Sequence, residues 1–243
     1  MLRFIALLII LIGFLILSTP ILLIEWIIGK FSPPIKAYSS LRIVQAVFRF
    51  MLFICGIKVE VIGKENIPQN QAVLYIGNHR SYFDILITYI QCQNLTGYIA
   101  KKEMDKAPLL NIWMRYLHCL FLDRKNIKEG LKVILSAIEK VKSGISICIF
   151  PEGTRSKNAR QSDLLEFHEG SFKIAQRAQC PVVPMVLSNT SEIFEDHFPR
   201  ICPTRVRLEY LPPIDLSKLE GDAKKFPGAY CRNLISQQLQ KTS

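Results

Sequence analysis

One polar octapeptide, residues 77–84 (Gly-Asn-His-Arg-Ser-Tyr-Phe-Asp), separates two apolar segments of different kinds. The segment before it, residues 72–76, is a continuous apolar run, as expected of a buried strand. The segment after it, residues 85–90, has the apolar side chains that one side of a buried helix requires. A strand that passes through a short turn into a helix is the unit of α/β proteins, so this stretch restricts the possible folds.

The same alternation continues along the chain. Further strands are predicted at residues 58–62, 97–101, 120–122, 145–150, 182–187 and 206–211, and helices at residues 108–118, 127–141, 170–178 and 223–240. Pro184 lies inside one of these strands and cannot donate a ladder hydrogen bond, so that strand is expected at a sheet edge or at a bulge. The pattern predicts an α/β fold with a single mixed, largely parallel sheet flanked by helices, preceded by an N-terminal apolar helical membrane element.

The N-terminal segment from Phe4 to Ile24 carries no charge over 21 residues. As a helix it would be about 31 Å long, enough to cross a hydrocarbon core. Two arrangements are open: a single membrane span, or a broken helical hairpin lying in one leaflet with Pro20 at the bend. Basic residues are more frequent after this segment than before it, which predicts a body on the cytoplasmic face of the cell membrane. They are Lys30, Lys36, Arg42 and Arg49 after it, and Arg3 before it.

Residues 1–57 are therefore predicted to form a membrane-associated helical region, and residues 58–243 an α/β domain. Within the first region, residues 41–57 repeat apolar side chains at helical spacing, with Arg42 and Arg49 among them. An amphipathic helix at the membrane interface and a core helix of the body fit this segment equally well.

The charge and the cysteines narrow the class of protein. The net charge of +11 comes from 31 basic and 20 acidic side chains and suits anionic partners. The apolar N-terminus favours a membrane, and without a nucleic-acid-binding motif we expect no nucleic-acid partner. The seven cysteines form no Cys-x-x-Cys pair and no Cys/His cluster, which predicts reduced, mostly buried thiols in a cytosolic compartment and no metal site.

His79 and Asp84 are the first candidates for chemistry. Five residues turn a regular helix by about 500°, which would place two helical side chains about 140° apart. The pair can meet if His79 lies in the turn and only Asp84 lies in the helix, with Ser81 as N-cap. A carboxylate on one imidazole nitrogen leaves the other nitrogen as a base. Since no Gly-x-Ser-x-Gly sequence occurs, the expected nucleophile is a substrate hydroxyl; the alternative for the pair is a structural hydrogen bond.

Other polar side chains also follow predicted strands, and a largely parallel sheet would gather them in one crevice at its carboxyl edge. These side chains are His79, Lys101, Arg124 and Glu152 to Arg155. Gly153 permits a tight turn, Arg155 can fork onto a phosphate, and Arg124 offers a second guanidinium. The alternatives are a solvated loop charge for Arg155 and a surface ion pair for Arg124.

Four blocks carry a family resemblance: Asn78-His79 to Asp84, Phe121-Leu122-Asp123-Arg124, Phe150 to Ser156 (Phe-Pro-Glu-Gly-Thr-Arg-Ser), and Val183-Pro184. In this order they resemble the blocks of the glycerophospholipid acyltransferases, in particular the 1-acyl-sn-glycerol-3-phosphate (lysophosphatidic acid) acyltransferases. The segment Gly170-Ser171-Phe172-Lys173 also resembles that family, and the likeness extends over residues 40–240. Tyr82-Phe83 departs from it, because family members often carry Trp and an aliphatic residue there.

The resemblance implies acyl transfer from a thioester to the sn-2 hydroxyl of lysophosphatidic acid, giving phosphatidic acid. His79 would be the base and Asp84 its partner; Arg124, Glu152, Gly153 and Arg155 would hold the phosphate. From their position after the strand predicted at residues 97–101, Lys101, Lys102 or a nearby backbone amide is expected to stabilise the oxyanion. No metal or cofactor is implied beyond acyl-CoA or acyl carrier protein as co-substrate, with membrane lipid as the surrounding partner.

Alternative functions remain at this point. Another lysophospholipid or glycerol-3-phosphate could be the acceptor. A hydrolase with water as nucleophile, or an inactive lipid-binding scaffold, would belong to other classes. His168, between Glu166 and Glu169, is the rival base, but no strand places it.

Overall fold

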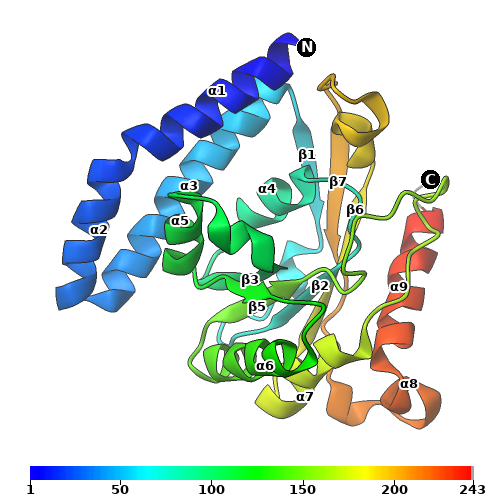
Figure 1. Cartoon of the computed structure of the whole chain (residues 1–243). Coiled ribbons are helices and arrows are strands. Elements are labelled where there is room, and N and C mark those ends of the chain that lie inside the picture. The colour runs from blue at the N-terminus through cyan, green and yellow to red at the C-terminus, as the bar shows by residue number, and fades with distance from the viewer. Residues whose placement is uncertain (242–243) are drawn as a thin grey trace.

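A single seven-stranded sheet forms the centre of the computed structural model, which describes residues 1–241 (Figure 1). The strand order is β1-β7-β6-β2-β5-β3-β4, and only the β6–β7 pair is antiparallel. The mixed, largely parallel sheet is therefore confirmed. The strands are β1 (Lys58–Ile62), β2 (Leu74–Gly77), β3 (Thr96–Lys101), β4 (Leu120–Leu122), β5 (Ser146–Ile149), β6 (Val182–Ser188) and β7 (Arg205–Tyr210).

Helices cover both faces of this sheet, as the fold prediction requires. One face packs against α3, α4 and α5, and the other against α6, α7 and α9. Alternate residues of β2 go to opposite layers, Tyr75 to the first and Leu74 and Ile76 to the second, as the pleat demands. The helices are α1 (Leu2–Leu17), α2 (Thr19–Phe31), α3 (Pro33–Cys55), α4 (Phe83–Tyr89), α5 (Leu110–Tyr116), α6 (Ile127–Lys142), α7 (Lys173–Ala178), α8 (Gly221–Lys225) and α9 (Pro227–Lys241).

The position of Pro184 corrects one prediction. The edge placement is wrong, because β6 lies between β7 and β2. The bulge alternative is closer: Met185 pairs with Tyr210, whereas Val182 bridges to Ile214, so two residues of β6 face three residues of the opposing chain. The missing N–H of Pro184 thus falls where the ladder is already interrupted.

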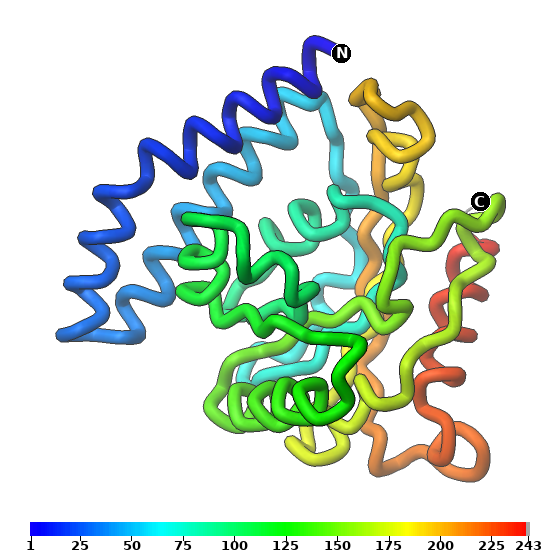
Figure 2. Tube along the Cα trace, in the orientation of Figure 1, coloured from blue at the N-terminus to red at the C-terminus, as the bar shows by residue number. Residues whose placement is uncertain are grey.

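The N-terminal helices are bent where the sequence is interrupted. The axes of α1 and α2 differ by 49°, and the break lies at Ser18, two residues before the predicted bend at Pro20. Pro20 lies instead in the first turn of α2, where its missing N–H costs no helical bond. The helix α3 returns alongside both of them (Figures 1 and 2).

Most of the surface of α1 and α2 is apolar and exposed. No residue of α1 is buried, and α2 buries only Leu22 and Glu25. By length and composition α3 is the one helix among residues 1–241 that could cross a membrane alone, and the bent α1–α2 pair passes the same test together. The exposed apolar side chains include Ile9, Ile12, Ile16, Leu23, Trp26 and Phe31.

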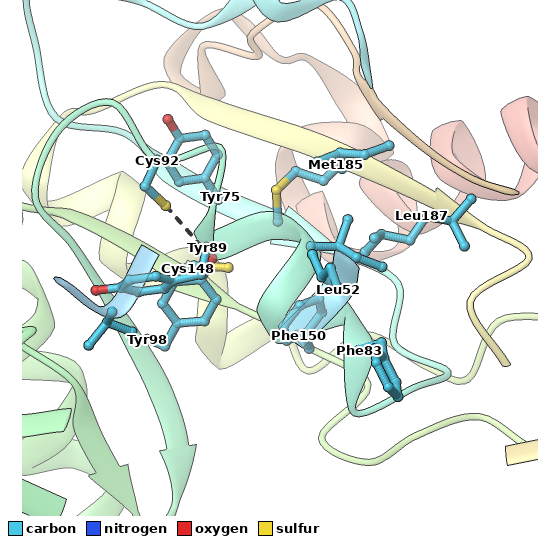
Figure 3. Close-up of a cluster of buried hydrophobic side chains, with 14 of the residues drawn as sticks. Leu52, Tyr75, Phe83, Tyr89, Cys92, Tyr98, Cys148, Phe150, Met185 and Leu187 are labelled. Carbon is cyan, nitrogen blue, oxygen red and sulfur yellow. Dashed lines mark hydrogen bonds between the residues drawn. The ribbon is translucent and has the colours of Figure 1, made fainter. Parts of the chain in front are cut away.

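The helix α3 belongs to the core of the body along part of its length. Leu41, Val44 and Leu52 are buried in the same apolar cluster as Tyr75, while Phe53 near its C-terminal end is exposed. Figure 3 shows Leu52 in this cluster with Tyr75, Tyr98 and Cys148 from three strands. Residues 41–57 therefore include a core helix of the body that also leaves apolar side chains on the surface.

Polar contacts attach the three N-terminal helices, α1 to α3, to the body. The Trp113 Nε1–H donates to Ser18 Oγ at 3.0 Å, at the break between α1 and α2. The fully buried Gln45 of α3 donates from Nε2 to the carbonyls of Tyr89 (3.0 Å) and Cys92 (2.7 Å). Tyr89 is the last residue of α4 and its carbonyl also accepts the Cys92 N–H, whereas Cys92 lies three residues beyond the helix. The N-terminal helices are thus connected, through Gln45, to the end of α4, the helix that follows the polar octapeptide.

The cysteines agree with the sequence prediction as far as their bonding is concerned. All seven are free, and five of them are buried. Burial raises the pKa of the Cys92 and Cys119 thiols to about 11, so at neutral pH these two are protonated apolar-like side chains.

Replacement of Gln45 by Ala tests the attachment of α3. The Cys92 carbonyl would lose its side-chain donor and the Tyr89 carbonyl would lose one of two donors, so we expect the free energy of unfolding to fall by about 2 kcal/mol. For a chain of this size this corresponds to roughly 4–8 °C in Tm, measured by thermal unfolding in detergent micelles. The control is Gln69→Ala, an exposed glutamine whose amide bonds only to the nearby Ile67 carbonyl. Equal Tm values for both variants would contradict this role.

Candidate active site

His79 and Asp84 are in contact, as the spacing predicts. The distance from His79 Nδ1 to Asp84 Oδ2 is 2.7 Å. His79 lies in the turn after β2, and Asp84 is the second residue of α4. The helix begins one residue later than the sequence suggests: Tyr82 occupies the N-cap position, and Ser81 Oγ accepts from the Phe83 N–H at 3.1 Å.

One oxygen of the Asp84 carboxylate, Oδ2, accepts three donors, whereas Oδ1 is buried and has no hydrogen-bond partner among residues 1–241. Its Oδ2 also accepts the backbone N–H groups of Arg80 and Ser81, each at 2.8 Å, and the side chain is fully buried. With Nδ1 of His79 directed at this oxygen, the neutral imidazole carries its proton on Nδ1, and Nε2 has a free lone pair. The His79 side chain is 17% exposed, so a ligand can reach it. Phe150 stacks on the ring with centroids 4.5 Å apart and limits its rotation.

The loop after β5 holds the backbone of His79. Glu152 Oε1 accepts the His79 N–H at 2.7 Å, and the His79 carbonyl accepts the Ser156 N–H at 2.8 Å. The other oxygen of Glu152 accepts the Leu165 N–H at 3.0 Å. Burial raises the pKa of Glu152, and the two N–H donors act in the opposite direction. The sequence pattern places Glu152 at the phosphate; in the structure both of its oxygens are bonded to backbone, so it lies in the framework of the site.

Asn78 contributes to the framework in a way the sequence pattern does not reveal. Its fully buried side chain donates from Nδ2 to the Leu187 carbonyl and accepts the Leu187 N–H on Oδ1, both at 2.8 Å. The amide thus imitates a peptide unit and extends the pairing of β2 with β6 by one position beyond Gly77. The sequence signals were its polar side chain directly after a buried strand and its place in the first of the four blocks, and neither indicates a partner on β6.

Gly153 brings Arg124 and His168 close to the turn. Its φ is +72°, and a Cβ atom there would lie 3.1 Å from His168 Nε2 and 3.8 Å from Arg124 Cζ. The positive φ favours glycine at this position, and a Cβ atom would also crowd the His168 ring, whereas its distance to Arg124 would be an ordinary contact. The rival base, His168, thus borders the site, but within residues 1–241 no carboxylate is bonded to its ring.

Arg124 remains exposed beside Gly153. Across the described part of the chain, its guanidinium has no hydrogen-bond or ion-pair partner, so the predicted alternative of a surface ion pair is absent there. The neighbouring Asp123 pairs instead with Lys102 at 2.9 Å, and Lys101 lies 3.5 Å from Glu103. Both lysines lie at the carboxyl end of β3, as predicted, and both ammonium groups face carboxylates.

Arg155 is more tightly held than a solvated loop charge. Its Nη1 donates to Glu195 Oε1 at 2.8 Å, and its Cζ lies 3.6 Å from the centroid of the Tyr82 ring. Arg155 and Tyr82 line a cavity of about 610 Å³ together with Arg80, Ser156, Phe194 and Glu195. Glu195 follows β6, 40 residues after Arg155, and no local sequence signal connects the two.

The two arginines approach the site from different sides. Arg124 follows β4 and meets the loop after β5 at Gly153, whereas Arg155 leans toward Glu195, which follows β6. In the sheet β4 and β6 lie on opposite sides of β5, so the predicted residues surround the turn that carries His79. They are not joined in one direct network.

The arrangement suits deprotonation of a hydroxyl on an anionic ligand. An oriented imidazole with a free Nε2 is a general base, and two guanidinium groups near it favour a negative charge. Within residues 1–241 no serine or cysteine side chain is bonded to the His79 ring, and no three His, Cys, Asp or Glu side chains gather as a metal site would require. The ligand itself would therefore have to supply the hydroxyl.

Comparisons with known proteins identify acyltransferases as the proteins that this chain resembles. A family model described as Acyltransferase matches residues 58–188. The 1-acyl-sn-glycerol-3-phosphate acyltransferase of Borreliella burgdorferi is 30% identical over 201 residues, covering 83% of this chain and 79% of that protein. The enzyme of the same name from Limnanthes douglasii is 30% identical over 194 residues, covering 77% and 67%.

A solved structure has the same fold. The crystal structure of the 1-acyl-sn-glycerophosphate (LPA) acyltransferase PlsC from Thermotoga maritima matches with a TM-score of 0.80 and 22% sequence identity, covering 99% of this chain and 95% of that one. The match includes the N-terminal helices as well as the sheet, because nearly the whole chain is covered.

Replacement of Glu152 by Gln tests the framework role. A glutamine can accept only one of the two backbone N–H groups and turns its NH₂ toward the other. We expect the free energy of unfolding to fall by about 1–3 kcal/mol, measured by denaturant unfolding in micelles. The matched control is Glu166→Gln in the same loop, where the side chain is exposed. Unchanged stability of the Glu152 variant would show that the carboxylate does not hold the turn.

Proposed function

The chain belongs to the acyltransferase family, and from this premise we propose that it transfers a fatty acyl group from a thioester to the sn-2 hydroxyl of 1-acyl-sn-glycerol-3-phosphate, giving phosphatidic acid. The observation that carries the proposal is the 2.7 Å contact of His79 with the buried Asp84, at a turn bordered by Arg124 and Arg155. The step belongs to phospholipid biosynthesis.

The reaction needs no acyl-enzyme. His79 Nε2 accepts the proton of the sn-2 hydroxyl as its oxygen attacks the thioester carbonyl. The imidazolium that forms carries a positive charge, and the negative charge of the buried Asp84 carboxylate stabilises it. When the tetrahedral intermediate collapses, the C–S bond breaks and the departing thiolate takes the proton from His79. The ester bond replaces the thioester bond, and His79 returns to its neutral state.

Arg155 and Arg124 are proposed to hold the phosphate of the acceptor. Arg155 lines the cavity beside the turn, and Arg124 is exposed beside Gly153. Charge-assisted bonds from guanidinium to phosphate are stronger than neutral ones and fix orientation. Lys101, Lys102 or a backbone amide at the end of β3 is proposed to stabilise the oxyanion. The intact His79–Asp84 pair disfavours an inactive scaffold.

The N-terminal helices give the protein its membrane association. The exposed apolar surface of α1 and α2 would be costly in water over an area this large. Because α1 and α2 are bent and lie along α3, we propose that residues 1–57 lie within one leaflet, on the cytoplasmic face. The acyl chains of acceptor and product then stay in the bilayer during turnover. The acyl donor is acyl-CoA or an acyl carrier protein.

Replacement of His79 by Ala tests the base. We expect kcat for acylation of lysophosphatidate to fall by about 10²–10⁴-fold, measured with radiolabelled or mass-detected phosphatidate. The matched control is His168→Ala, which removes the rival histidine and should keep most of the turnover. Thermal unfolding of both variants checks that they fold. Loss of activity in the His168 variant, with retention in the His79 variant, would reverse the assignment.

Replacement of Arg155 by Ala tests the phosphate contact. We expect the KM for lysophosphatidate to rise about 10–100-fold while the KM for the acyl donor stays within about twofold, because one charge-assisted contact is lost. Arg160→Ala is the control: it removes a side chain that is 82% exposed and pairs only with Asp163. A normal acceptor KM in the Arg155 variant would remove Arg155 from the phosphate site.

A further inference from the structure

The connection between β6 and β7 places a carboxylate on the arginine proposed to bind phosphate. Glu195 Oε1 accepts two hydrogen bonds, one from Arg155 Nη1 at 2.8 Å and one from the Tyr82 N–H at 2.9 Å. Its second oxygen is buried and has no hydrogen-bond partner among residues 1–241. A single carboxylate oxygen therefore connects the turn before α4 with the loop after β5.

Arg155 is held on two sides by this arrangement. Its guanidinium lies 3.6 Å over the Tyr82 ring while one edge bonds to Glu195. The side chains of Arg155 and Glu195 are 29% and 18% exposed, so the pair is shielded from most of the solvent. The remaining N–H groups of Arg155 have no acceptor within residues 1–241, and the residue lines the cavity of about 610 Å³. One edge of the guanidinium fork is thus occupied, and the other is available to a ligand.

The position of Glu195 is fixed from the opposite direction by the first helix. The preceding residue, Phe194, stacks on Phe4 of α1 with ring centroids 5.2 Å apart and an interplanar angle of 19°. Phe194 also contacts Phe198 edge-on, with centroids 5.4 Å apart. The Glu195 carboxylate is therefore carried by a segment that packs on the N-terminal helix. This packing restrains the position of the carboxylate and, through it, the position of Arg155.

We propose that Glu195 is a positioning residue for acceptor binding, which holds the Arg155 guanidinium flat on Tyr82 so that its free edge meets the phosphate. An unrestrained arginine loses side-chain entropy when it binds a ligand, and a preorganised one has already lost it. The proposal rests on the phosphate role of Arg155 given above. It also implies that the N-terminal helix helps to shape the phosphate site, through Phe4 and Phe194.

The test compares Glu195→Ala, Glu195→Gln and the control Glu192→Ala in the full-length protein in micelles. Glu192 lies in the same connection, is exposed and carries the same charge. For Glu195→Ala we expect the acceptor KM to rise about tenfold, because the released Arg155 side chain then loses its entropy on binding the acceptor, with kcat and donor KM within about twofold. Glu195→Gln keeps an acceptor oxygen and should restore most of the affinity. The inhibition constant of inorganic phosphate, competing with the acceptor, should rise in parallel.

The outcomes separate this proposal from the function on which it rests. If the wild-type protein does not acylate lysophosphatidate, the proposed function fails. If the wild type is active and Glu195→Ala has an unchanged or lower acceptor KM, the positioning role is overturned, and a lower KM would mean that the carboxylate competes with phosphate. A fall in kcat with an unchanged KM would also overturn it. An equal rise of KM in Glu192→Ala would show that any change in this connection weakens acceptor binding, and it would overturn a specific role of Glu195.

Discussion

One buried carboxylate oxygen, Oδ2 of Asp84, holds the centre of the site together. It accepts the Nδ1–H of His79 and the backbone N–H groups of Arg80 and Ser81. Both N–H groups lie in the turn before α4, where a buried donor must find an acceptor outside regular structure, so the Asp84 carboxylate stabilises the turn. The same atom orients the imidazole. The structural and the catalytic explanations of this pair are therefore two effects of one interaction.

The conformation of the turn that carries His79 depends on the order of the strands. Because β2 lies between β6 and β5, the backbone of His79 can be bonded by Glu152 and Ser156 from one side, while Asn78 bonds to Leu187 on the other. Each of these contacts satisfies a backbone group that would otherwise be buried without a partner. The site is rigid because the polar groups that surround it complete the hydrogen bonding of the sheet.

Much of the fold and part of the site could be predicted from local patterns. The strands were located to within two residues, and the five-residue spacing correctly indicated a turn followed by a helix. For Pro184 the edge alternative was wrong and the bulge alternative was close, because an interior strand tolerates a missing donor where the opposing chain is irregular. The resemblance implied a phosphate role for Glu152, and only the structure shows that both of its oxygens accept backbone N–H groups.

The sequence by itself determined the elements and the chemistry that each one carries: the apolar N-terminal segment, the alternating strands and helices, and the post-strand positions of His79, Arg124 and Arg155. These follow from hydrophobic periodicity and turn chemistry, which act over a few residues. Only the tertiary structure decided that Glu195 would lie on Arg155, that Arg124 would approach Gly153, and that Phe194 would pack on Phe4. Such contacts join residues far apart in the chain, and they exist only once the sheet order places the ends of distant strands next to one another.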